Sequence, residues 1–149
     1  MARHTDRREF LRSGLALGTL ALAPRGNACE VVAEYLRVVH PWTRATTPGA
    51  GHAALCMTID QVTAFDRLVG VRTPVASGAE MGGVGSGPRV DFPVRPGGEF
   101  VLDEDGTYVR LTGLQHALVI GREYPLQLEF ERSGIVLASL SVDFDVRAG

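Results

Sequence analysis

A chain of 149 residues, 45 % of them hydrophobic, is long enough to form one globular domain with its own core. Its net charge of −2 is uneven: residues 1–28 carry five arginines against two acidic residues, which gives +3 and leaves −5 on residues 29–149. A mildly acidic domain without a run of basic residues argues against nucleic acid as a partner.

The first 28 residues resemble an export signal. Arg7 and Arg8 lie in the run DRREFLR, which closely follows the pattern of a twin-arginine signal. The apolar run at 13–23 is shorter than the roughly 20 residues that a membrane-spanning helix needs. Small residues at 26–28 suit a signal peptidase. We therefore predict a signal peptide at 1–28, a mature domain at 29–149 and a periplasmic location reached by the twin-arginine pathway.

Cys29 and Cys56 are the two cysteines of the chain, and three roles are open for them. A lipoprotein signal also ends at a cysteine, and a lipid on Cys29 would tether the domain to a membrane, although Gly26 stands where such signals prefer leucine. In an oxidising compartment, Cys29 and Cys56 are instead a candidate disulfide pair. The third interpretation takes Cys56, in the apolar run LCM, as a small buried core residue.

From residue 30 onward, short apolar segments alternate with glycine and proline turns. The clearest alternation of apolar and polar residues occurs at 126–130 and 140–146. Further strands are predicted at 31–39, 52–59, 68–72, 99–102 and 108–111. The glycine-rich segment 78–88 is expected to form a loop. Because no segment after residue 28 has a helical period, the chain is predicted to be all-β, a Greek-key sandwich or barrel of seven to nine strands.

The segments HPWTRAT, FDRLVGVRTPVA, RPGGEFVL, RLTGL and YPLQLEFERSGIV follow one another in this order between residues 40 and 136. Together they resemble the framework of the PCu(A)C family of periplasmic copper chaperones. The resemblance implies a cupredoxin-like β-sandwich that binds Cu(I) and delivers it for assembly of an envelope copper enzyme. Trp42, in the first of these segments, is then expected to fill the core.

The copper ligands of that family follow a pattern close to His-x10-Met-x21-His-x-Met, and imidazole and thioether groups suit Cu(I). On this chain the final His and Met fall on Tyr108 and Arg110, and the first His falls on Gly82, next to Met81. The middle Met falls within 84–90, which contains neither sulfur nor histidine. The resemblance therefore implies a divergent member that has not retained the usual ligands.

A remodelled copper site would need other ligands, and the candidates are Met81, His52 and Cys56. His52 and Cys56 are an even number of residues apart, so a regular strand places them on one face. Met57 is at an odd spacing from His52 and is expected in the core. No pair has the spacing that strongly indicates a metal site. Copper is therefore expected either at a remodelled site or not at all.

The sequence does not indicate an enzyme. It has no Gly-x-Ser-x-Gly nucleophile elbow and no histidine placed beside an orienting carboxylate. The acidic run 103–105 precedes Gly106 and is expected to form a solvated hairpin tip. His40 and His116 are expected to be surface or turn residues.

Two hypotheses follow from these features. One is a copper chaperone with a remodelled or degenerate site. The other is a metal-free β-sandwich that assists assembly in the periplasm by binding a copper enzyme or another protein there.

Overall fold

The described part of the chain, residues 30–147 of a computed structural model, consists of strands, turns and loops, which confirms the all-β prediction. Within residues 30–147, no helix is long and apolar enough to cross a membrane. The signal-peptide prediction for 1–28 lies outside the described residues. The strands are β1 (Glu30–Val32), β2 (Arg37–Arg44), β3 (His52–Asp60), β4 (Asp66–Arg72), β5 (Ala76–Gly83), β6 (Phe92–Val94), β7 (Phe100–Leu102), β8 (Thr107–Leu114), β9 (Glu123–Phe130) and β10 (Gly134–Phe144).

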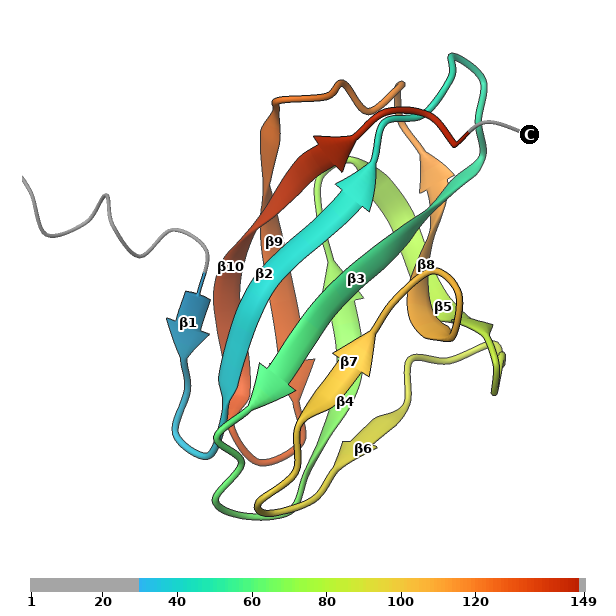
Figure 1. The fold of residues 1–149 in the computed structure, drawn as a ribbon. Coiled ribbons are helices and arrows are strands. Elements are labelled where there is room, and N and C mark those ends of the chain that lie inside the picture. The colour runs from blue at the N-terminus through green and yellow to red at the C-terminus, as the bar shows by residue number, and fades with distance from the viewer. Residues whose placement is uncertain (1–29, 148–149) are drawn as a thin grey trace, which may run out of the picture.

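The strands form one curled sheet in the shape of a half-barrel (Figure 1). Its order is β5-β8-β3-β2-β10-β9-β4-β6, with β1 added beside β2 and β7 beside β3. All neighbours are antiparallel except β2 and β10, which run parallel. The sheet curls so far that β4 and β5, which are not paired with each other, come into contact. This arrangement is the expected cupredoxin-like sandwich, with an open seam between β4 and β5.

The core lies inside the curl and follows the period-two pattern of the sequence. On β3, Leu55, Met57 and Ile59 are buried and face inward, as expected for Met57. On β9 and β10, the inward residues Leu128 and Leu140 are completely buried. Each such side chain contributes about 1.5–3 kcal/mol when it is removed from water. The strands predicted from clear alternation are therefore confirmed.

The glycine-rich segment 78–88 is only partly a loop, so this prediction was wrong for its first half. Residues 78–83 belong to β5 and pair with β8 in continuous register. Glycine usually weakens a strand because it has no side chain to pack. Here a Cβ added at Gly82 would overlap the ring of Tyr108, so the absence of a side chain makes room for that ring.

The acidic run 103–105 does not lie at the tip of a hairpin. β7 and β8 both pair with β3, one after the other: Leu102 lies opposite Met57, and Val109 lies opposite Leu55. Residues 103–106 therefore form a short excursion between two strand segments that run the same way along β3. The backbone N–H of Asp103 closes it by donating to the carbonyl of Thr107 over 3.0 Å.

A bulge in β2 moves Trp42 out of the core, which corrects the expectation for this residue. His40 has a positive φ of 49°, and the register between β2 and β3 shifts between Val39 and Trp42. The extra residue exchanges the two faces of the strand. Thr43 is consequently buried, and Trp42 is half-buried and packs edge-on against Phe144, with ring centroids 4.9 Å apart.

Candidate functional site

The positions that correspond to the family's copper ligands are brought together on the outer face of β5 and β8. Gly82 lies opposite Tyr108, and Glu80 lies opposite Arg110. Alternate residues of a strand share a face, so these four positions form one surface cluster. The register places Tyr108 directly over the backbone of Gly82. Gly82, Tyr108 and Arg110, the positions that the resemblance assigns to copper ligands, therefore lie together on this face.

This cluster is held by an ion pair and a phenol. The Nη1 atom of Arg110 lies 3.3 Å from Oε1 of Glu80, and its Nη2 donates to the Tyr108 hydroxyl over 3.3 Å. The guanidinium carbon lies 5.9 Å from the centre of the Tyr108 ring. The hydrogen bond to Tyr108 and the neighbouring Glu80 carboxylate both raise the pKa of Arg110 above its ordinary value. Arg110 is therefore a fixed cation in this cluster.

These residues do not fit Cu(I). A guanidinium has no lone pair to offer a metal, and its positive charge repels a cation. Carboxylate and phenol oxygens are hard ligands, whereas Cu(I) prefers thioether, thiolate and imidazole groups. Met81 would supply a thioether, but it is 4 % exposed and belongs to the core, on the opposite face of β5 from Glu80 and Gly82.

The other two candidate ligands lie on β3. His52 is exposed at the start of the strand and pairs with Thr112 of β8. Cys56 shares its face of the strand, as parity predicts, but is completely buried. Since Met81 faces the core and His52 faces solvent, the structure does not bring Met81, His52 and Cys56 together. No group of three or more His, Cys, Asp or Glu side chains within residues 30–147 is arranged to hold a metal ion.

The excursion at 103–106 covers Cys56. Glu104 reaches across to Arg44 on β2, whose Nε donates to both carboxylate oxygens over 2.7 and 2.8 Å. Burial, together with the charges of Glu104 and Asp103, raises the pKa of the Cys56 thiol to about 12. Cys56 is thus a protonated thiol under an ion pair. Its predicted disulfide partner, Cys29, lies outside the described residues.

His40 and His116, the other histidines within residues 30–147, take part in surface contacts. His40, at the bulge of β2, pairs through Nε2 with the Asp143 carboxylate on β10. His116 lies in the loop before β9, with its ring centre 5.7 Å from that of Tyr124. Neither lies beside the cluster on β5 and β8. The ion pair of His40 joins residues 103 positions apart, which explains why sequence patterns did not show it.

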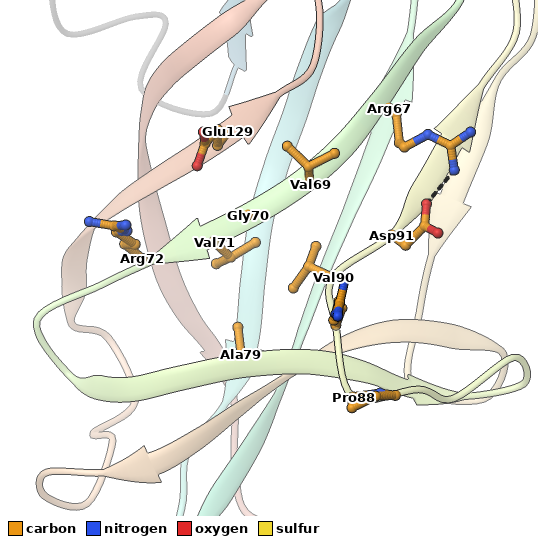
Figure 2. A pocket seen from close by; sticks show the side chains of 11 residues that line it. Arg67, Val69, Gly70, Val71, Arg72, Ala79, Pro88, Val90, Asp91 and Glu129 are labelled. Atoms are coloured by element: carbon orange, nitrogen blue, oxygen red, sulfur yellow. Dashed lines mark hydrogen bonds and ion pairs between the residues drawn. The ribbon is translucent and has the colours of Figure 1, made fainter.

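A groove of about 580 Å³ lies at the open seam, and the sequence analysis missed it. Figure 2 shows three side chains that point toward one another there: Val71 of β4, Ala79 of β5, and Val90 of the segment that precedes β6. Val71 and Val90 are nearly buried and form an apolar floor. Arg72 and Arg89 also line the groove. No motif signals such a site, because its lining comes from β4, β5 and the segment before β6, which are brought together only by the fold.

Comparisons with known proteins agree with this frame. The model of the family described as "Putative lipoprotein LpqE-like" matches residues 36–142. No match to a curated protein was found.

Solved structures of PCuAC domains are similar to the chain. The copper-bound PCuAC domain from PmoF2 has a TM-score of 0.71 and 22 % identity over 77 % of this chain and 97 % of that one. The apo PCuAC domain from PmoF1 has a TM-score of 0.70 and 26 % identity over 77 % and 98 %. The Cu(I) form of DR1885 from Deinococcus radiodurans has a TM-score of 0.59 and 21 % identity over 81 % and 85 %. Since the family model spans well over half of the chain, this protein belongs to the LpqE-like family and is a PCuAC-type domain.

Proposed function

We propose that this protein is an exported PCuAC-type domain that acts by binding another protein of the cell envelope, and that it does not carry Cu(I) at the family's usual position. One observation carries the proposal: the ligand positions on β5 and β8 hold Gly82, Tyr108 and Arg110, with Glu80 closing the ion pair. A face built from a guanidinium, a carboxylate and a phenol can contact a protein but cannot hold a soft metal ion.

The location in the periplasm is part of this proposal. It is supported by Arg7 and Arg8 in the run DRREFLR and by the short apolar segment that follows. A partner involved in copper-enzyme assembly is supported by the solved PCuAC neighbours, two of which are named as copper forms. In this proposal the partner, and not this chain, supplies the copper ligands.

A Cu(I) titration against a colorimetric chelator tests the proposal. With both cysteines replaced by serine, the chain is expected to bind no Cu(I) more tightly than micromolar. The triple variant Gly82→His, Tyr108→His, Arg110→Met restores three ligand positions of the family pattern and is expected to gain one bound Cu(I). Replacing Tyr108 also frees the space over Gly82 that a side chain there needs. Tight stoichiometric binding by the chain without cysteines would refute the proposal.

A second candidate is delivery of Cu(I) from a remodelled site. The observation in its favour is that His52 is exposed on the same face of β3 as Cys56. In this case the wild-type chain binds Cu(I) and His52→Ala loses that binding, whereas His116→Ala, in the loop before β9, retains it. Met81→Ala tests the remaining candidate ligand in the same titration.

A further inference from the structure

We infer that the open seam between β4 and β5 binds an extended, acidic segment of a partner polypeptide, which adds to β5 as a further strand. This inference rests on the proposed function, because it names the surface and the chemistry of the partner that the proposed function requires. Within residues 30–147 it stands on three features of the seam: an unpaired strand edge, an apolar floor and two arginines without carboxylate partners.

The unpaired edge belongs to β5, the last strand of the sheet on this side. On its outer side, Met81 exchanges backbone hydrogen bonds of 3.0 and 3.2 Å with Gly87, and the N–H of Ala76 donates to Thr73 over 3.3 Å. Between these points, residues 77–80 have no strand partner on that side within the described chain. Backbone groups alternate in direction along a strand, so the N–H and C=O of Ala79, like those of Met81, point away from β8 and into the seam.

Such an edge is a template for another chain. An extended peptide that pairs with a free edge gains its affinity from main-chain hydrogen bonds and its specificity from pockets for alternate side chains. The free stretch of β5 fits an added strand of about four to six residues, which is an ordinary strand length. Pairing there would partly close the half-barrel.

Two hollows make the seam continuous along β4. The larger, shown in Figure 2, and a second of about 490 Å³ share Val71 and Arg72, and the second extends to Ser77 and Gly78 of β5. Val69 adds to the apolar surface, because the register of β4 against β9 shifts between Leu68 and Gly70 and leaves Val69 39 % exposed. Alternate apolar side chains of an added strand can pack on this surface.

The charges at the seam favour an acidic occupant. Three arginines and two acids line the larger hollow, although residues 29–149 together carry −5. Arg67 is paired with Asp91 over 2.5 Å. Arg72 and Arg89 form no ion pair with a carboxylate in residues 30–147. A second copy of this chain paired through β5 would bring a second Arg72 and a second Arg89 to the seam, so an acidic segment of another protein is the better match.

The probe is a fluorescein-labelled ten-residue peptide in which valine alternates with aspartate, titrated with the full-length chain and followed by fluorescence anisotropy. Two matched peptides carry lysine in place of aspartate, or methyl groups on alternate backbone nitrogens. The acidic peptide is expected to bind, with both matched peptides at least about tenfold weaker. Absence of binding by the acidic peptide, or equal binding by the lysine peptide, overturns the inference.

Variants of the chain locate the binding. Ala79→Pro removes the N–H that faces the seam without removing a hydrogen bond to β8, and is expected to weaken binding about three- to tenfold. Ala79→Val keeps the donor and serves as the control. Arg72→Ala and Arg89→Ala are each expected to weaken binding about two- to fivefold. Should Ala79→Pro fail to fold, as judged by circular dichroism, the methylated peptide still tests the role of the backbone.

Peptide binding that none of these variants alters would overturn the seam as the site and leave the proposed function standing. Self-association in sedimentation experiments that Ala79→Pro abolishes would replace the partner by a second copy of this chain. The Cu(I) titration is independent of both results, because valine and aspartate offer no soft ligand. Failure of the proposed function is therefore distinguishable from failure of this inference.

Discussion

The reactivity of Cys56 tests whether its thiol is available for metal binding or for a disulfide. Cys56 is completely buried on the outer face of β3, under the ion pair between Arg44 and Glu104. In the Cys29→Ser chain, Cys56 is the one remaining cysteine. This chain is alkylated with iodoacetamide at pH 8. The reaction is followed by intact-mass spectrometry, in buffer and in urea that unfolds the domain.

The expected magnitude follows from the thiol pKa. Burial and the charges of Glu104 and Asp103 raise this pKa from 9.0 to about 12. Only the thiolate is alkylated, so a rise of this size reduces the reactive fraction at pH 8 by about a thousandfold, and steric cover slows the reaction further. Glu104→Gln removes one of the charges that raise the pKa, so alkylation is expected to accelerate. Glu99→Gln, at an exposed residue elsewhere, is the control.

Alkylation of the native chain within about tenfold of the unfolded chain would refute this reasoning, because it requires an accessible thiolate. It would also return Cys56 to the set of copper ligands, since a thiol must lose its proton to bind a metal. Slow alkylation in the native state and fast alkylation in urea would place Cys56 among the inert buried thiols.

Two further predictions concern stability. Burial alone would raise the pKa of Asp66, but hydrogen bonds from Ser133, Arg132 and Arg67 outweigh it and lower this pKa. Asp66→Asn should therefore cost about 2–4 kcal/mol in urea unfolding at pH 7. Because the pKa of Asp66 is lower in the folded chain than in the unfolded chain, the extra stability of the wild type should disappear as the pH falls below about 3.9. The stability of the Asp66→Asn variant should not change through the titration of this position. Gly82→Ala should cost about 1–3 kcal/mol in the same assay, because its Cβ overlaps the Tyr108 ring, and a double variant with Tyr108→Ser should recover most of the loss. If the losses of unfolding free energy in the two single variants simply add in the double variant, the side chain at position 82 does not meet Tyr108 and the reasoning is wrong.

The sequence predicted the strands whose two faces differ in environment. On β9 one face is buried and the other is not, so apolar and polar residues alternate along the strand. β5 was missed because its glycines indicate a turn, although Gly82 is required by a contact with Tyr108, 26 positions later in the chain. Trp42 was expected in the core from its place in the segment HPWTRAT, and that resemblance does not show the bulge at His40, which exchanges the faces of β2.

Of the candidate sites, some features are indicated by motifs and others depend on contacts between distant parts of the chain. The motifs assign Gly82, Tyr108 and Arg110 to ligand positions, and the register of β5 against β8 brings these three positions together. The ion pair that covers Cys56 could not be predicted from the sequence, since it joins Arg44 and Glu104, which are 60 residues apart. The seam could not be predicted either, because it lies between two strands that are not paired and depends on the curvature of the whole sheet.

The cluster on β5 and β8 is internally consistent without a metal. Gly82 gives space to Tyr108, and Glu80 balances the charge of Arg110 directly across the ladder. Cross-strand pairs of this kind each stabilise a sheet by about 0.2–1 kcal/mol. Restoring only one ligand would break a pair without completing a metal site: a histidine at position 82 overlaps Tyr108, and a methionine at position 110 leaves Glu80 without its partner. A single substitution therefore disturbs the cluster without building a metal site, which is why the copper titration changes Gly82, Tyr108 and Arg110 together.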